Sequence, residues 1–107
     1  MPTPRPHRPV RGSRSGRPIM GVLDLLGQRW VMRVLWELRE DALTFRALQE
    51  RCDAVSPTVL NRRLTELRAA GLVEHGAGEG YALTRDGRGL LAALAPLASW
   101  AERWRPR

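Results

Sequence analysis

The side chains best suited to chemistry in this chain are hydroxyl, amide and guanidinium groups that recur at helical spacing between residues 56 and 71. At about 100° per residue, Thr58, Arg62 and Thr65 share one side of a helix, flanked by Asn61 and Arg68. Groups of this kind recognise base edges and phosphates in the major groove of DNA. The pattern is equally typical of the exposed side of any amphipathic helix, so the rest of the chain must separate the two interpretations.

The same stretch carries start and stop signals for a helix. Ser56 can cap the first free amides, Pro57 suits the first helical position, and Gly71 can take the left-handed conformation that ends a helix. The side opposite the polar groups is apolar and requires a core, because it carries Leu60, Leu64 and Leu67.

Charge and composition divide the chain into a tail and one small domain. Of the 18 arginines, five lie in residues 1–18, a Pro-, Arg-, Ser- and Gly-rich stretch without acids. The remainder has 13 arginines against 11 acids, so its net charge is +2, compared with +7 for the whole chain. We predict a disordered basic tail over residues 1–18, which either contacts DNA phosphates and the minor groove or is simply solvated, and a folded domain over residues 19–105.

The sequence argues against an enzyme, a metal protein and a membrane protein. The only histidines are His7 and His75, and the only cysteine is Cys52, so neither a disulfide nor a cysteine-based zinc cluster can form within the chain. No glycine-rich phosphate loop is present, and we expect no cofactor. The longest apolar run, residues 90–98, is too short to span a membrane and contains Pro96. We expect a cytoplasmic, nucleoid-associated protein.

The order of the expected elements predicts a winged helix-turn-helix, that is, a mainly α fold with a small β-hairpin (α+β). A first helix over residues 19–26 precedes a second one that begins near Gln28, and a third, capped by Thr44, ends near Cys52. The Ser56 helix follows after a brief turn. Two strand-like runs, residues 72–75 and 80–83, then form a hairpin or wing, and Thr84 caps a last helix.

The last helix has one broad apolar side that includes two tryptophans one turn apart, Trp100 and Trp104. Such a surface is costly to expose on a monomer, so it requires a partner. Pro96 predicts a kink or break near residues 92–95.

The ordered set of motifs resembles the HxlR-type winged helix-turn-helix regulators of bacteria. The resemblance implies a homodimer built by the first and last helices, with one recognition helix in each half-site of a pseudo-palindromic operator. The residues that carry it are 23–30, 45–48, Ser56 with 59–64 and Leu67, 71–74, 81–84 with Gly87 and Arg88, and Trp100. The residues expected at the dimer interface are Leu23, Leu26, Leu90, Leu94, Leu97, Trp100 and Trp104.

The chain departs from this family in three places. Many relatives have a cysteine just before the proline that precedes the first helix, where this chain has Arg17. Cys52 stands where relatives have an apolar residue, so we expect a packed, inert thiol. The hairpin is short and its tip lacks Arg and Lys, which leaves His75 or the amino-terminal arm to supply the contacts of a wing.

The main hypothesis is a sequence-specific repressor or activator that binds double-stranded DNA. We expect Arg63, which lies nearer the buried side, to pair with an acid or to reach the DNA backbone. A winged-helix interaction module without specific DNA binding and an RNA-associated basic protein are the alternatives. If the chain is a DNA-binding regulator, the residues that face bases would be Thr58, Asn61, Arg62 and Thr65. Those that contact phosphates would be Thr44, Arg46, Ser56, Arg68 and His75.

An unidentified small-molecule effector would need a pocket. Four tryptophans could wall one between the dimer helices and the core, or could serve only core and dimer packing: Trp30, Trp36, Trp100 and Trp104.

Overall fold

A computed structural model of the chain describes residues 17–76, 78 and 80–106. Residues 1–16 of the predicted basic tail and part of the hairpin tip therefore lie outside the described residues. The elements, in chain order, are α1 (Pro18–Leu26), α2 (Val31–Glu37), α3 (Phe45–Arg51), α4 (Pro57–Ala69), β1 (Val73–His75), β2 (Tyr81–Leu83) and α5 (Arg85–Arg103). The predicted mainly α fold with one hairpin is confirmed.

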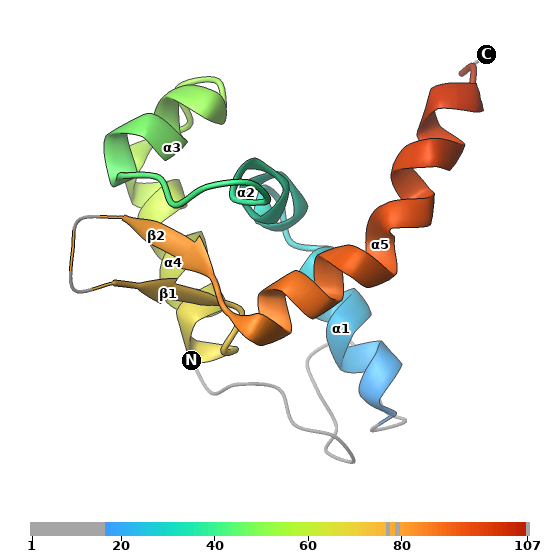
Figure 1. Cartoon of the computed structure of the whole chain (residues 1–107), viewed down its shortest axis with the longest axis horizontal. Coiled ribbons are helices and arrows are strands. Elements are labelled where there is room, and N and C mark those ends of the chain that lie inside the picture. The colour runs from blue at the N-terminus through green and yellow to red at the C-terminus, as the bar shows by residue number, and fades with distance from the viewer. Residues whose placement is uncertain (1–16, 77, 79, 107) are drawn as a thin grey trace.

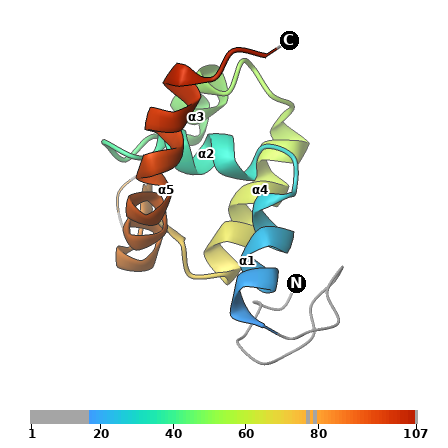
Figure 2. The same ribbon diagram turned by 90° about the vertical axis from the view of Figure 1, so that its right-hand side faces the viewer.

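The core lies where α2, α3 and α4 meet, with the hairpin against α4 and the start of α5 (Figures 1 and 2). Side chains from α2, α3, α4 and both strands are almost completely removed from solvent, and the half-buried Leu90 and Leu91 of α5 pack against them, so one apolar cluster holds these elements together. The largest fully buried side chains are Leu35, Leu48, Leu60, Leu64, Leu67, Val31, Val34 and Cys52.

Three predicted caps begin three helices. The hydroxyl oxygens of Thr44, Ser56 and Thr84 accept hydrogen bonds from the backbone N–H groups of Ala47, Val59 and Gly87. Each satisfies one of the amides that a helix start leaves without a partner. The hydroxyl of Thr84 also donates to the carbonyl of Gly71 at 2.6 Å, so it joins the end of α4 to the start of α5.

Gly71 ends α4 as predicted. Its φ is 76°, a left-handed value that glycine adopts without steric cost. The N–H of Gly71 bonds to the carbonyl of Arg68, and the N–H of Leu72 bonds to that of Leu67. This pair of bonds is the Schellman arrangement, which directs the chain out of α4 and into β1.

The structure corrects the predicted starts of the first two helices. Pro18 is not tail but the first residue of α1, where its missing N–H costs nothing. Helix α2 begins at Val31, not near Gln28, because Trp30 has a left-handed φ of 77° that interrupts helical geometry. In α1 the buried leucine is Leu25.

The hairpin is antiparallel, with Val73 opposite Leu83 and His75 opposite Tyr81. Leu43 adds a single bridge to Tyr81, and two backbone hydrogen bonds of 2.9 and 2.7 Å join these two residues. The residue before the Thr44 cap therefore adds a one-residue edge to the wing. It ties the wing to the start of the helix-turn-helix.

Helix α5 continues through Pro96 without the predicted break and bends partway along (Figure 1). Its beginning packs closely, because Gly87 is buried where the chain leaves α4. Its far end projects away from α4. The second half of α5 thus leaves large apolar side chains exposed to solvent.

Candidate DNA-binding surface

Helix α4 has two faces of opposite character. Leu60, Leu64 and Leu67 are buried, whereas the polar residues predicted to read DNA are all exposed: Thr58, Asn61, Arg62, Thr65 and Arg68. The Ser56 cap and the Gly71 stop define thirteen helical residues between them. The geometry therefore presents the expected polar face to solvent on a helix that is fixed at both ends.

The exposed side chains of α4 differ in their freedom to bind a ligand. The Thr65 hydroxyl donates to the carbonyl of Asn61 at 2.8 Å, so it can offer only acceptor lone pairs. Within the described part of the chain, Arg62 and Arg68 have neither an ion-pair nor a hydrogen-bond partner. Arg62 also borders a cleft of about 560 Å³ between α4 and the turn that joins α1 to α2. These two guanidinium groups remain available for phosphates or bases.

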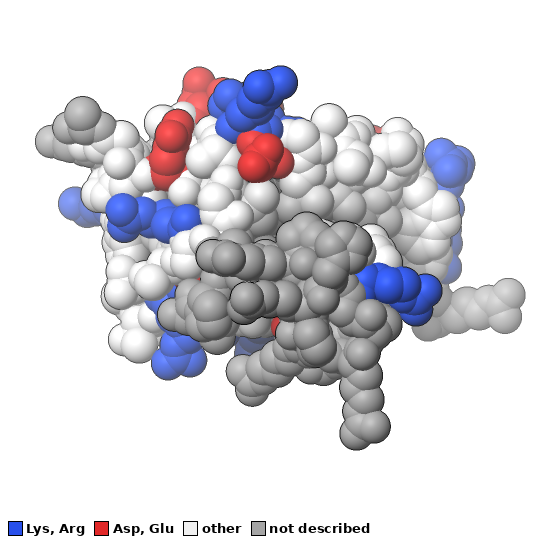
Figure 3. Space-filling view, turned by 90° about the horizontal axis from the view of Figure 1, so that it is seen from below, with Lys and Arg blue, Asp and Glu red and all other residues white. Residues whose placement is uncertain are grey.

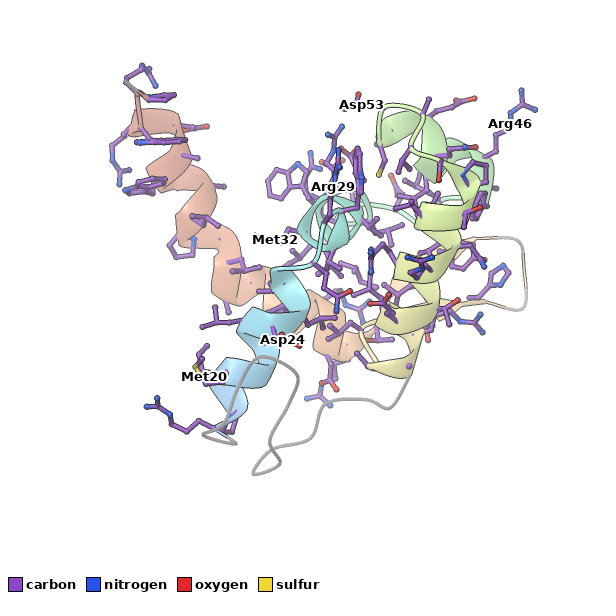
Figure 4. The ribbon with its side chains drawn as sticks, turned by 180° about the vertical axis from the view of Figure 1, so that it is seen from behind. Met20, Asp24, Arg29, Met32, Arg46 and Asp53 are labelled. Atoms are coloured by element: carbon purple, nitrogen blue, oxygen red, sulfur yellow. The ribbon has the colours of Figure 1, made fainter. Side chains whose placement is uncertain are left out.

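The start of α3 lies beside this face. The Thr44 hydroxyl is occupied as a cap, and Arg46 is 89% exposed with only a 3.6 Å ion pair to Glu50. In Figure 4 the labelled Arg46 projects into solvent. Because an exposed pair of this length contributes little, the Arg46 guanidinium can exchange Glu50 for a phosphate.

Arg63 points inward and pairs with an acid, which is the first of its two predicted roles. Its Nη1 lies 2.6 Å from both Glu66 Oε1 and Gln28 Oε1. The Arg63 and Glu66 side chains are 14% and 8% exposed. The sequence did not indicate that Glu66 is buried, although its position three residues after Arg63 allows such a pair. The ion pair lies within α4, and the hydrogen bond from Arg63 to Gln28 joins α4 to the turn before α2.

On the wing, His75 is exposed and stacks on Tyr81 with ring centroids 4.1 Å apart. The stacking fixes the imidazole on the strand, but His75 makes no hydrogen bond to any other described residue. On the visible part of the underside in Figure 3, arginines stand apart around the margin and do not form one patch. The described domain thus offers scattered positive charge, in keeping with its low net charge.

The residues predicted at the dimer interface fall into two groups. Leu26 and Leu90 are half-buried against the core of their own chain, which reduces the surface they can offer to a partner. Leu23 and Leu97 are 53% and 44% exposed. Trp100 and Trp104 are 48% and 53% exposed and stack on each other with ring centroids 5.4 Å apart. The exposed members of the predicted interface therefore lie on α1 and in the second half of α5, and Met32 and Trp36 of α2 are exposed as well.

A groove of about 590 Å³ separates α2 from α5, and Leu94 is among its lining residues. Only one of the four tryptophans considered for an effector pocket, Trp36, lines it. Trp30 instead packs against the core. The arginine of the next turn, Arg39, lies over the Trp36 ring at 4.1 Å. The predicted four-tryptophan wall is thus not found around this groove.

Cys52 is completely buried in the core, and this burial raises the pKa of its thiol. A buried neutral thiol is a poor nucleophile. Among the described residues there is no cluster of His, Cys, Asp and Glu that could hold a metal ion. No helix in the same residues is long and apolar enough to cross a membrane.

Known proteins are similar to this chain in both sequence and fold. Residues 25–107 match the family described as HxlR-like helix-turn-helix. The chain is 30% identical over 88 residues to the uncharacterized HTH-type transcriptional regulator YvaP of Bacillus subtilis strain 168, an alignment that covers 77% of this chain and 82% of that protein.

Two solved structures are also similar. Quinone-bound YodB from B. subtilis has a TM-score of 0.74 and 28% identity, over 80% of this chain and 97% of that one. A possible HxlR family transcriptional factor from Thermoplasma volcanium GSS1 has a TM-score of 0.70 and 31% identity, over 79% and 82%. The chain therefore belongs to the HxlR-like family of winged helix-turn-helix transcriptional regulators, whose members are not enzymes.

Proposed function

We propose that this regulator binds a pseudo-palindromic DNA operator as a homodimer and places one α4 helix in the major groove of each half-site. The observation that carries the proposal is the polar face of α4, which is exposed along its length while the opposite face is fully buried. Thr58, Asn61 and Arg62 would read bases, with Thr65 as an acceptor. This function implies a cytoplasmic location on the nucleoid.

Phosphate contacts would come from the edges of the same surface. Arg68 has no partner in the described chain, and Arg46 has only a weak one. Thr44 and Ser56 lie at the starts of two helices, where backbone N–H groups favour phosphate oxygens. His75 on β1 would supply a contact from the wing. These groups would orient α4, and the base-facing residues would give specificity.

Arg62→Ala should weaken binding to the operator by about 1–3 kcal/mol and binding to random DNA by much less. The reason is that a guanidinium on a base edge recognises sequence, whereas one on a phosphate does not. Fluorescence anisotropy with a footprinted operator and a random duplex of equal length, at one salt concentration, measures both losses.

Arg39→Ala is the matched control for this experiment. It removes the same charge from the segment just after α2, where Arg39 contacts Trp36 and Glu40 and not α4. We expect it to change neither affinity appreciably. Equal losses on operator and random DNA in Arg62→Ala would instead assign Arg62 to a phosphate.

The double variant Trp100→Glu/Trp104→Glu should convert the dimer into a monomer, because two charges would be buried in an apolar contact. Sedimentation velocity at micromolar concentration measures the change in mass. Ala95→Glu is the control, because it adds charge at an exposed position of the same helix. Ala98 is left unchanged because it lines the α2–α5 groove. A wild-type protein that is a stable monomer would contradict the assembly.

The same binding assay separates the alternative functions. Competitor RNA that displaces the operator more effectively than competitor DNA would indicate an RNA-associated protein. Absence of any retained genomic fragment at near-physiological salt would indicate an interaction module without specific DNA binding. A footprint at a palindrome with nanomolar affinity would support the proposal.

A further inference from the structure

The turn between α3 and α4 has an unusual backbone. Asp53 and Ala54 have φ values of 56° and 58°, both left-handed, and neither residue is glycine. A single residue in this region is uncommon, and two in succession persist only where the surroundings hold them. Ala54 has no side-chain oxygen with which to stabilise the conformation locally. Backbone hydrogen bonds from Asp53 and Ala54 to the carbonyls of Glu50 and Gln49 support the turn from the end of α3, so contacts from outside α3 are needed to fix it relative to the core.

Arg33 of α2 supplies those contacts. Its Nη2 donates to the carbonyl oxygen of Arg51 at 2.6 Å, at the end of α3. Its Nη1 donates to Asp53 Oδ2 at 3.1 Å. Its Nε donates to Glu37 Oε2 at 2.8 Å, one helical turn along α2. Three separate edges of one planar guanidinium thus bind the turn and its own helix, a geometry that an ammonium group cannot reproduce.

The guanidinium is itself fixed. The Glu37 side chain is only 14% exposed, and its hydrogen bond with Arg33 raises the pKa of Arg33 above its ordinary value. Within the turn, Gln49 Nε2 donates to the carbonyl of Val55 at 2.9 Å, but Gln49 belongs to α3 and moves with it. Among the described residues, Arg33 is the one side chain from outside α3 and α4 that hydrogen-bonds the segment joining them.

We propose that Arg33 is a positioning residue for the recognition helix: it ties the strained turn to α2 and so sets where α4 starts relative to the core. The proposal rests on the proposed function of α4. Arg33 touches no DNA in this role, and it acts on Thr58 and Asn61 through the turn that precedes them.

Arg33→Gln and Arg33→Lys test the proposal together. Lysine keeps the charge but cannot make the three contacts, so we expect both variants to lose at least tenfold in operator affinity and less than threefold on random DNA. Hydrogen exchange of the backbone amides of residues 52–59 is the second measurement. It should accelerate at least tenfold in both variants, while the amides of Leu35 and Leu64 in the core keep their protection.

Arg39→Gln is the control, because Arg39 lies just after α2 but contacts Trp36 and Glu40 instead of the turn. It should leave affinity and exchange unchanged. Operator binding that Arg33→Lys restores to the wild-type level would overturn the proposal, since charge alone would then suffice. Exchange that rises equally in the turn and the core would also overturn it, because Arg33 would then stabilise the whole fold.

Failure of the proposed function gives a different result. A wild-type protein that binds no DNA refutes the function of α4. The exchange of residues 52–59 in Arg33→Gln then still decides whether Arg33 holds the turn, and unchanged protection there would refute the positioning role.

Discussion

Replacing Leu60 with alanine should lower the free energy of unfolding by about 2–5 kcal/mol, a large part of the stability of a domain of this size. Leu60 is completely buried on the inner face of α4. Truncation removes apolar contacts and leaves a cavity among Leu35, Leu48 and other close-packed side chains of the core. Urea denaturation at one fixed protein concentration measures the change, because the stability of a protein that self-associates depends on its concentration.

Thr58→Ala on the opposite face of α4 is the matched control for Leu60→Ala. Thr58 is exposed and makes no hydrogen bond within the described chain, so its truncation should change stability by about 0.5 kcal/mol or less. Its operator affinity should nevertheless fall, since the lost hydroxyl faces the bases in the proposed complex. A Thr58→Ala protein with wild-type operator affinity would remove Thr58 from the set of base-reading residues.

Gly87→Ala should destabilise the protein by about 1–3 kcal/mol or more, because no space exists for a side chain there. A Cβ built on Gly87 would lie 2.1 Å from the carbonyl oxygen of Leu72, a backbone atom at the base of the wing. Relief requires that α5 move away from the hairpin. Thermal unfolding at fixed concentration and the chemical shifts of β1 report the two consequences.

Gly89→Ala, on the same helix, should instead raise the stability of the protein. Nothing lies within 4 Å of a Cβ at Gly89, and alanine in an exposed helical position is favoured over glycine by about 0.5–1 kcal/mol. The pair therefore separates packing from helix propensity. Equal effects at the two positions would show that the close approach of Gly87 to Leu72 is not what limits position 87.

The elements with local signals could be predicted from the sequence. Ser56, Thr44, Thr84 and Gly71 act through hydrogen bonds or backbone geometry within a few residues, so their identity and position were sufficient. The apolar face of α4 was also predictable, because its leucines recur at the helical period. The polar face follows from the same periodicity.

Features that depend on tertiary contacts could not be predicted in this way. The left-handed Trp30 has no local signal, and it moved the start of α2 by three residues. Leu25 is buried because of how α1 lies against α2, which periodicity within α1 does not determine. Hydrogen bonds from Arg33 to Arg51 and Asp53 join residues that are 18 and 20 positions apart in the sequence. One arginine among many therefore gave no indication of these contacts.

The hydroxyl of Thr84 bonds to Gly71 just after α4 and to Gly87 in the first turn of α5. The end of α4 and the start of α5 therefore meet at one point, which can act as a pivot. From that pivot α5 extends for 19 residues, a lever arm of about 28 Å at the usual helical rise. A tilt of about 5° at the pivot moves the far end of such an arm by about 2.5 Å. In a dimer held together at Trp100 and Trp104, the same tilt would change the separation of the two α4 helices by a distance approaching the rise of one base pair.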